Sequence, residues 1–265
     1  MNETDLKLLL EAFWFAPQDA FLRARERAIW QKHRFSRPTL DIGCSDGRIG
    51  KLLFEGKKID LGIDVDARLI GQAKACGAYR FVAVMDAQSL ALKSGSFTTT
   101  IANSTFEHIT DDLTAVKEIA RVTKKGGTIF LTVPTRKLQT ALRTLIRDDR
   151  RWKQFNRRVR HLHYRSKAEW IKILQGAGLS LVGVQYYFPK RAVVAWYRLY
   201  RIATFRPYRR ELWSYIKDSP YGKTVPSSLV KRLLFEYLKR FLNMKSGGNG
   251  LWMYLTAEKK EDAKD

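Results

Sequence analysis

Residues 40–48 read LDIGCSDGR, and this stretch decides the fold. A short apolar strand pattern ends at Ile42, two glycines follow at Gly43 and Gly47, and a helical pattern comes next. Glycines at such a turn let the backbone approach a ligand, because no Cβ stands in the way. The free N–H groups at the start of the helix favour an anionic or polar group there. The stretch therefore predicts a ligand-binding loop at the carboxyl edge of a parallel sheet.

Strand and helix patterns alternate around this loop, which is typical of an α/β sandwich with helices on both faces of the sheet. Ser166 and Glu169 form a capping-box pattern that opens a late helix. The predicted strands are residues 39–43, 59–64, 79–84, 96–103, 127–134, 179–188 and 250–257. The predicted helices are residues 3–15, 17–32, 47–56, 66–76, 111–122 and 166–178, with two more around 190–217 and 226–244.

The glycine loop does not match a nicotinamide-dinucleotide fingerprint. Gly-x-Gly-x-x-Gly counted from Gly43 needs glycines at positions 45 and 48, which are Ser45 and Arg48. A plain strand-to-helix turn would not require Asp41 beside the loop, nor Asp64 at the end of the next strand.

Five further features follow in a fixed order. They are Asp64, the triplet Met85-Asp86-Ala87, residues 103–109 (NSTFEHI), residues 118–127 (EIARVTKKGG) and residues 163–179. Together with the loop, they resemble the class I S-adenosylmethionine-dependent methyltransferases. The likeness is greatest to small-molecule and lipid-type members, such as those of quinone biosynthesis. It covers residues 39–188 and the last strand, and it implies a Rossmann-like seven-stranded sandwich.

The resemblance implies that S-adenosylmethionine is the cofactor. By this likeness Asp64 would bind the ribose hydroxyls, and Asp86 would contact the adenine amino group. A carboxylate suits a diol because it accepts two hydrogen bonds. Ser45 departs from the family pattern, which has a glycine there. The expected cofactor-binding residues are Asp41, Gly43, Cys44, Ser45, Gly47, Asp64, Val65, Asp86, Ala87 and Asn103.

Methyl transfer requires the donor and acceptor to be aligned, and an acceptor of high pKa also needs a general base. The candidates are His108, His161, His163 and Tyr164. His108 could instead be structural, and His161 and His163 could stabilise a helix end. No metal site is expected, since Cys44 and Cys76 make no zinc or disulfide framework and favour a reducing compartment.

The charge is concentrated in two segments. The chain has 49 basic and 26 acidic side chains, a net charge of +23. Residues 135–165 hold 11 basic and 2 acidic side chains, and residues 189–245 hold 14 and 3. Aromatic residues are interleaved with the basic ones in the second segment, which suits an anionic membrane surface. The same composition could bind RNA, or could belong to a lid with a solvated face.

We therefore expect a methyltransferase for a small-molecule acceptor, a lipid or lipid-linked one, at an anionic membrane surface. The alternatives are an RNA methyltransferase and a non-catalytic cofactor-binding module. The residues after the fourth strand lack the Asn/Asp-Pro-Pro-aromatic stretch of amino-methylating nucleic-acid enzymes, and neither cysteine is placed for cytosine chemistry. We expect a cytoplasmic location, because the N-terminal residues do not form a signal-peptide pattern. At the membrane, the protein would bind peripherally to the cytoplasmic face. The oligomeric state stays open.

The expected domain organisation has four parts. They are an N-terminal helical cap (1–36), a catalytic core (37–188 and 246–258), basic helical insertions over the active site (135–165 and 189–245) and a solvated tail (259–265).

Overall fold

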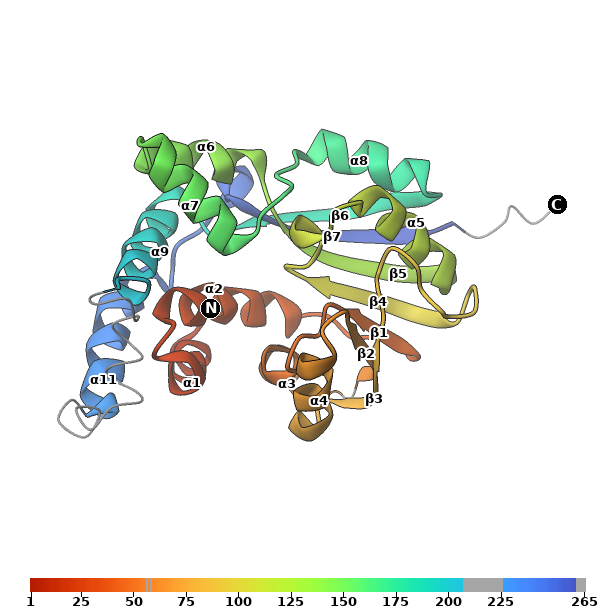
Figure 1. Ribbon diagram of the computed structural model, residues 1–265, viewed down its shortest axis with the longest axis horizontal. Coiled ribbons are helices and arrows are strands. Elements are labelled where there is room, and N and C mark those ends of the chain that lie inside the picture. The colour runs from red at the N-terminus through yellow and green to blue at the C-terminus, as the bar shows by residue number, and fades with distance from the viewer. Residues whose placement is uncertain (56, 58, 207–225, 261–265) are drawn as a thin grey trace. The chain divides into compact units, whose positions relative to one another are not determined.

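The computed structural model describes residues 1–55, 57, 59–206 and 226–260 (Figure 1). Two compact units are present, residues 1–33 with 188–246 and residues 34–187 with 247–265. No described helix is both long and apolar enough to cross a membrane. Part of the second basic segment, with Arg209 and Arg210, lies outside the described residues, as does the end of the expected tail.

The larger unit contains a seven-stranded sheet in the order β3-β2-β1-β4-β5-β7-β6. Only β7 runs antiparallel to its neighbours, and the other pairs are parallel. This confirms the predicted Rossmann-like sandwich. The strands are β1 (Thr39–Ile42), β2 (Ile59–Asp64), β3 (Tyr79–Val84), β4 (Phe97–Asn103), β5 (Thr123–Pro134), β6 (Leu179–Tyr187) and β7 (Trp252–Lys259). The helices are α3 (Arg48–Leu53), α4 (Ala67–Cys76), η1 (Phe106–His108), α5 (Asp112–Val122), α6 (Arg136–Leu145), α7 (Asp149–Val159), α8 (Lys167–Gly176) and η5 (Gly247–Asn249).

The apolar core of this unit lies between the sheet and helices α5 and α8. Leu40 and Ile42 of β1 pack there with Ile119 of α5 and Trp170 of α8, all fully buried. Successive side chains of a strand point to opposite faces. Asp41 therefore faces the other side of the sheet, where α4 packs on β2 and β3.

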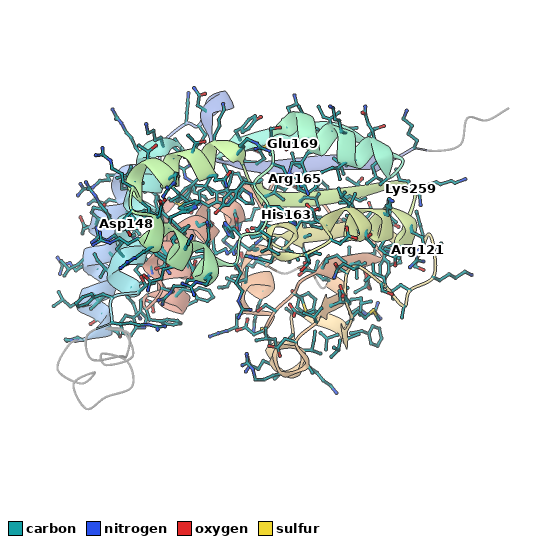
Figure 2. All side chains as sticks on the ribbon, turned by 45° about the horizontal axis from the view of Figure 1, so that its top comes forward. Arg121, Asp148, His163, Arg165, Glu169 and Lys259 are labelled. Atoms are coloured by element: carbon teal, nitrogen blue, oxygen red, sulfur yellow. The ribbon has the colours of Figure 1, made fainter. Side chains whose placement is uncertain are left out.

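The EIAR motif has a structural role. The Arg121 guanidinium donates to both oxygens of Glu118 and to the carbonyls of Leu90 and Leu92 (Figure 2). Glu118 also accepts from the Leu90 N–H. The pair thus holds the loop between β3 and β4 against α5.

β5 begins four residues earlier than predicted. Glycines and lysines at 124–127 suggested a turn, but the strand starts at Thr123. The buried Thr123 hydroxyl donates to the Ile119 carbonyl and lies 2.8 Å from the Thr100 hydroxyl. These bonds hold the start of the strand beside β4, where the register shifts between Phe97 and Thr99.

The first basic segment is the helix pair α6 and α7, inserted between β5 and α8. Its two ends meet, because Thr135 and Arg165 form a parallel bridge. The Thr135 hydroxyl donates to the Leu251 carbonyl, and Arg165 donates through two nitrogens to the buried carboxylate of Asp112 (Figure 2). Ser166 and Glu169 then form the predicted capping box of α8.

The smaller unit is helical. Its elements are α1 (Glu3–Phe13), α2 (Pro17–Trp30), α9 (Lys190–Ala203), α11 (Ser227–Leu238) and η4 (Lys239–Phe241). A buried ion pair joins Arg27 of α2 to Asp5 of α1, with 3.0 Å between Nε and Oδ1. Val193 and Trp196 of α9 are buried, so this part of its aromatic face belongs to the core of the unit.

Three glycines leave room for one aromatic ring on the face of the sheet that Asp41 occupies. A Cβ at Gly50 would lie 2.2 Å from the Tyr79 hydroxyl, and one at Gly62 would lie 2.8 Å from the ring. Gly47 is also in contact distance of this ring. The Tyr79 hydroxyl donates to Asp41 Oδ2 at 2.7 Å.

Burial controls the ionisation of Asp41. Loss of water raises the pKa of this carboxyl to about 7, although the hydrogen bond from Tyr79 opposes the shift. Asp60, at the other end of the neighbouring strand, behaves in the opposite way. Its hydrogen bonds from Arg37 and Thr39 hold the pKa of Asp60 well below the usual range.

These shifts predict how stability depends on pH. The Asp41 carboxyl has a higher pKa in the folded chain than in the unfolded one, so its contribution is greatest below about pH 4. That contribution falls as the pH rises towards 7, by an amount on the order of a few kcal/mol. In Asp41→Asn this loss is absent, so urea unfolding from pH 5 to 8 should show a flatter profile than the wild type.

Asp60→Asn is the matched control for this measurement. The lowered pKa of Asp60 places its own pH dependence in the acid range, so the slope from pH 5 to 8 should match that of the wild type. Equal slopes for Asp41→Asn and the wild type would show that Asp41 is already ionised in the folded protein at pH 5.

Candidate functional site

The glycine loop adopts a backbone conformation that its sequence only partly anticipates. Gly43, Ser45 and Gly47 all have positive φ, at 73°, 51° and 78°. The Gly43 and Cys44 N–H groups both donate to the carbonyl of Ile63 on β2. Ser45 therefore occupies a left-handed conformation that favours glycine.

Asp64 is held in place by the backbone on both sides. Its Oδ2 accepts from the Ser45 N–H and its Oδ1 from the Asp66 N–H, each at 3.0 Å. The side chain is half-buried at the end of β2, and Val65 beside it is 65% exposed. The carboxylate is thus oriented at the edge of the sheet and retains lone pairs for further donors.

Asp86 and Ala87 differ in their surroundings. Asp86 is exposed after β3 and accepts from the backbone and side-chain amides of Gln88. Gln88 in turn accepts from the Asp111 N–H, which links this turn to the start of α5. The Ala87 methyl is buried in the core, which leaves only its backbone for the predicted cofactor contact.

The end of β4 is packed closely against the loop. A Cβ at Gly43 would lie 2.5 Å from the Thr105 side chain, whose hydroxyl donates to the Ile42 carbonyl. The side-chain oxygen of Asn103, Oδ1, accepts a hydrogen bond from the Thr132 hydroxyl. Ser104 follows with a positive φ of 51°.

The predicted cofactor residues thus lie at the carboxyl ends of four neighbouring strands, β3, β2, β1 and β4. Asp41 differs from the rest, because its carboxylate is buried against Tyr79 rather than directed at the loop. Cys44 is buried as well, and burial beside Asp41 raises the pKa of its thiol. The thiol therefore stays protonated at neutral pH.

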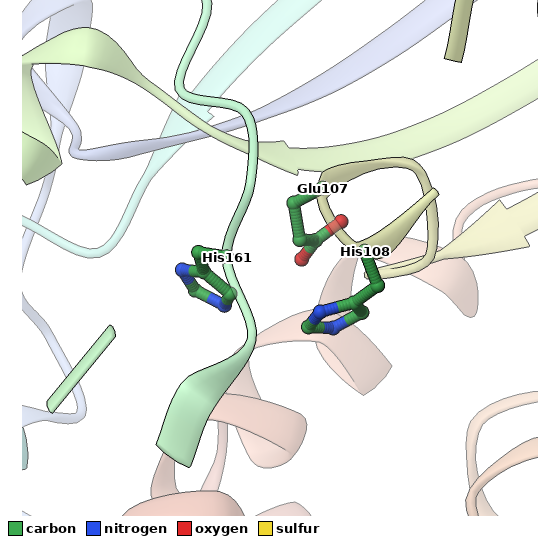
Figure 3. A group of neighbouring side chains, drawn as sticks. All are labelled: Glu107, His108 and His161. Atoms are coloured by element: carbon green, nitrogen blue, oxygen red, sulfur yellow. The ribbon is translucent and has the colours of Figure 1, made fainter. Parts of the chain in front are cut away.

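A second group of side chains forms where the 107–112 segment meets residues 160–165. Glu107 is 2% exposed, and its main-chain carbonyl accepts from the Leu162 N–H at 2.7 Å. The Glu107 carboxylate, His108 and His161 come together here, with His108 exposed and His161 half-buried (Figure 3). The two imidazole centroids are 5.2 Å apart.

The hydrogen bonds of these histidines define their orientation. His108 Nδ1 lies 3.0 Å from the Arg160 carbonyl, so this nitrogen carries the proton and Nε2 has the lone pair in the neutral ring. His161 Nδ1 lies 3.1 Å from the Tyr164 hydroxyl, which lies 3.4 Å from the Asn156 side chain. Burial near Glu107 raises the pKa of Tyr164, so its hydroxyl stays protonated.

His163 points elsewhere. Its Nε2 lies 2.9 Å from the Ile109 carbonyl and 3.9 Å from the Asp112 carboxylate that Arg165 binds (Figure 2). The structure therefore separates His163 from His161 and gives it a role in joining the two segments. Sequence reasoning missed Tyr79, Gln88, Thr105 and Glu107; of these, only Glu107 carried a signal, since it stands next to a candidate histidine.

Comparisons with known proteins agree with this architecture. Residues 40–131 match the family described as "Methyltransferase domain". A ubiquinone biosynthesis O-methyltransferase of Methylococcus capsulatus is 30% identical over 118 residues, which are 42% of this chain and 48% of that protein. The chain thus spans about half the length of this curated relative.

Two solved structures show the same fold. A methyltransferase dependent on S-adenosylmethionine from Thermotoga maritima has a TM-score of 0.59 and 19% identity, covering 96% of this chain and all of the other. The phosphoethanolamine N-methyltransferase 2 of Haemonchus contortus, solved with S-adenosyl-L-methionine, has a TM-score of 0.55 and 15% identity, covering 89% of this chain and 52% of the other. Residues 40–131 thus match a methyltransferase domain, and the whole chain has the fold of class I S-adenosylmethionine-dependent methyltransferases, in agreement with the resemblance of the ordered motifs.

Proposed function

We propose that this chain transfers the methyl group of S-adenosylmethionine to a small-molecule acceptor. The observation that carries the proposal is the Asp64 carboxylate, held beside the glycine loop by the Ser45 and Asp66 N–H groups. A fixed carboxylate next to a loop of positive-φ residues has the acceptor atoms and the open backbone that a nucleoside with a diol requires. The match to a methyltransferase domain over residues 40–131 supports the same cofactor.

The described residues fit this cofactor chemically. Asp64 would accept hydrogen bonds from the ribose, Asp86 would accept from the adenine amino group, and Asn103 and the loop would line the methionine end. When bound, the cofactor supplies an electrophilic methyl group on a sulfonium. The protein's own part is to align the acceptor with that carbon and to keep water away.

An acceptor hydroxyl or amine must also lose a proton. His108 and His161 are the candidates, because the two imidazoles come together beside the Glu107 carboxylate, shortly after the carboxyl end of β4. Tyr164 is better suited to orient His161, since its raised pKa keeps the hydroxyl protonated at neutral pH.

We further propose that the acceptor is a lipid or lipid-linked molecule, met at an anionic membrane surface on the cytoplasmic face. Support comes from exposed apolar side chains that stand beside basic ones. Leu229 and Leu233, one turn apart on α11, are 51% and 61% exposed, and Arg232 between them is exposed. Ile202 on α9 is half-exposed next to the exposed Arg201. Exposed leucines with arginines suit the boundary between headgroups and acyl chains, whereas RNA does not require them.

The affinity for the cofactor tests the role of Asp64. Asp64→Asn keeps the size of the side chain but removes the charge, so we expect at least a tenfold higher Kd for S-adenosylmethionine by calorimetry. Asp60→Asn, at the start of the same strand, should bind within twofold of the wild type. Equal affinity of Asp64→Asn and the wild type would contradict the assignment of the ribose site.

Transfer of a labelled methyl group tests the proposed reaction. A cell lipid extract incubated with the protein and methyl-labelled S-adenosylmethionine should yield a labelled product in the organic phase, and Asp64→Asn should yield much less. Label in added RNA but not in the extract would favour the RNA alternative. Binding of the cofactor without any labelled product would favour the non-catalytic module.

Sedimentation with vesicles tests the proposed membrane surface. Sedimentation with anionic vesicles should weaken in Arg198→Gln/Arg201→Gln by up to about thirtyfold, since each basic residue near the surface contributes about 1 kcal/mol. Leu229→Gln/Leu233→Gln should also weaken sedimentation, because it removes exposed apolar area without changing the charge.

Lys124→Gln/Lys125→Gln is the matched control for charge. It also removes two positive charges, from exposed side chains of the sheet unit. We expect its sedimentation with anionic vesicles to stay close to that of the wild type. Equal pelleting of the wild type with anionic and neutral vesicles would count against the membrane proposal.

A further inference from the structure

Glu107, His108 and His161 bring three metal-ligating groups to one place. Each offers one ligand atom, and these atoms all lie within 4.8 Å of one another. Two ligands lie in η1, shortly after β4, and the third lies just after α7, more than fifty residues later in the chain (Figure 3). A sequence scan for closely spaced ligands would therefore not find the group.

Two imidazoles and one carboxylate form a donor set that suits divalent transition metals, and Zn²⁺ in particular. Ligands of a tetrahedral Zn²⁺ ion are about 3.4 Å apart, given bonds of about 2.0–2.2 Å. The ligand atoms would therefore need to approach one another by up to about 1.4 Å. His108 is exposed and can rotate into this position, while the buried Glu107 provides a fixed point.

The groups around the histidines resemble the outer shell of a metal site. A metal-bound histidine usually donates its other ring N–H to a carbonyl or a similar acceptor, which fixes the ring and the tautomer. His108 Nδ1 meets the Arg160 carbonyl, and His161 Nδ1 meets the Tyr164 hydroxyl. Arg160 has a positive φ of 54°, so the backbone adopts an uncommon conformation where it presents this carbonyl.

Main-chain hydrogen bonds hold the two contributing segments together. The Glu107 carbonyl accepts from the Leu162 N–H, and His163 bonds to the Ile109 carbonyl. Arg165 then pairs with the buried Asp112. The ligands therefore sit on a pre-ordered junction, which lowers the conformational cost of binding an ion.

We propose that Glu107, His108 and His161 bind a divalent transition-metal ion, with Zn²⁺ as the best match. Three protein ligands leave at least one coordination position for water or for an oxygen of a bound molecule. A metal-bound imidazole cannot also accept a proton. With a metal ion bound there, His108 and His161 could not act as the general base proposed above for methyl transfer.

The test is metal binding by the full chain without a purification tag, stripped of metal and measured without S-adenosylmethionine. Calorimetry with Zn²⁺ should give one site per chain. His108→Ala and His161→Ala should each raise the Kd at least tenfold, and the double variant should lose the site. His33→Ala, in the helical unit, is the matched control and should bind like the wild type.

Two further measurements keep the result interpretable. Co²⁺ should give the visible absorption of a tetrahedral nitrogen and oxygen site in the wild type but not in His108→Ala, with equal circular dichroism showing that both are folded. Tyr164→Phe removes the hydroxyl beside His161 and should weaken Zn²⁺ binding about tenfold, as is usual for an outer-shell partner.

The proposal is overturned if the wild type binds no Zn²⁺, or if the double histidine variant binds it equally well. It is also overturned if Cys76→Ser, rather than the histidine variants, loses Zn²⁺ binding, because the ion would then lie elsewhere. These outcomes are independent of the methyl-transfer assay. A wild type without metal whose His108→Ala variant lacks activity would support a histidine base and reject the metal.

Discussion

The hydrogen bond from Tyr79 to the buried carboxylate of Asp41 is the contact on which the cofactor edge depends. It requires that Gly47, Gly50 and Gly62 carry no side chain, because the tyrosine ring fills the space that they leave. The glycines of this region thus serve packing inside the sheet unit as much as access to a ligand. The loop itself is fixed by Thr105 against Gly43 and by Asp64 beneath Ser45. These contacts within the chain hold the loop in shape, which reduces the ordering that ligand binding requires.

Glu107 plays a comparable part where the end of β4 meets the first basic insertion. Its main-chain carbonyl receives the chain that returns from α7, and its buried carboxylate faces the two histidines that meet there. One residue thus links the end of β4 to the basic insertion through the backbone and through the side chain. Removal of the carboxylate would affect the histidines, whereas the junction itself would keep its backbone bonds.

The cofactor edge could be predicted from the sequence because its signals are local. Each acid directly follows a strand, and parallel strands place their carboxyl ends together. Tyr79, Gln88 and Thr105 gave no such signal, since their roles arise from tertiary contacts with Asp41, Asp111 and Gly43.

The partners of the histidines and the orientation of the aromatic face of α9 were also hard to predict from the sequence, because they too depend on tertiary contacts. His161 and His163 are two residues apart but contact different partners, the Tyr164 hydroxyl and the Ile109 carbonyl. On α9, helical spacing alone could not show that Trp196 faces the interior while Arg198 and Arg201 are exposed. The packing of a neighbouring helix decides that choice.

The bridge between Thr135 and Arg165 makes the first basic insertion a closed excursion from the sheet. Both ends are fixed by bonds to Leu251 and Asp112, which lie outside the insertion. Lengthening a closed loop costs little entropy, since the cost grows only with the logarithm of its length. The chain between these two residues can therefore change in length or sequence while the strand ends that carry the predicted cofactor residues keep their place.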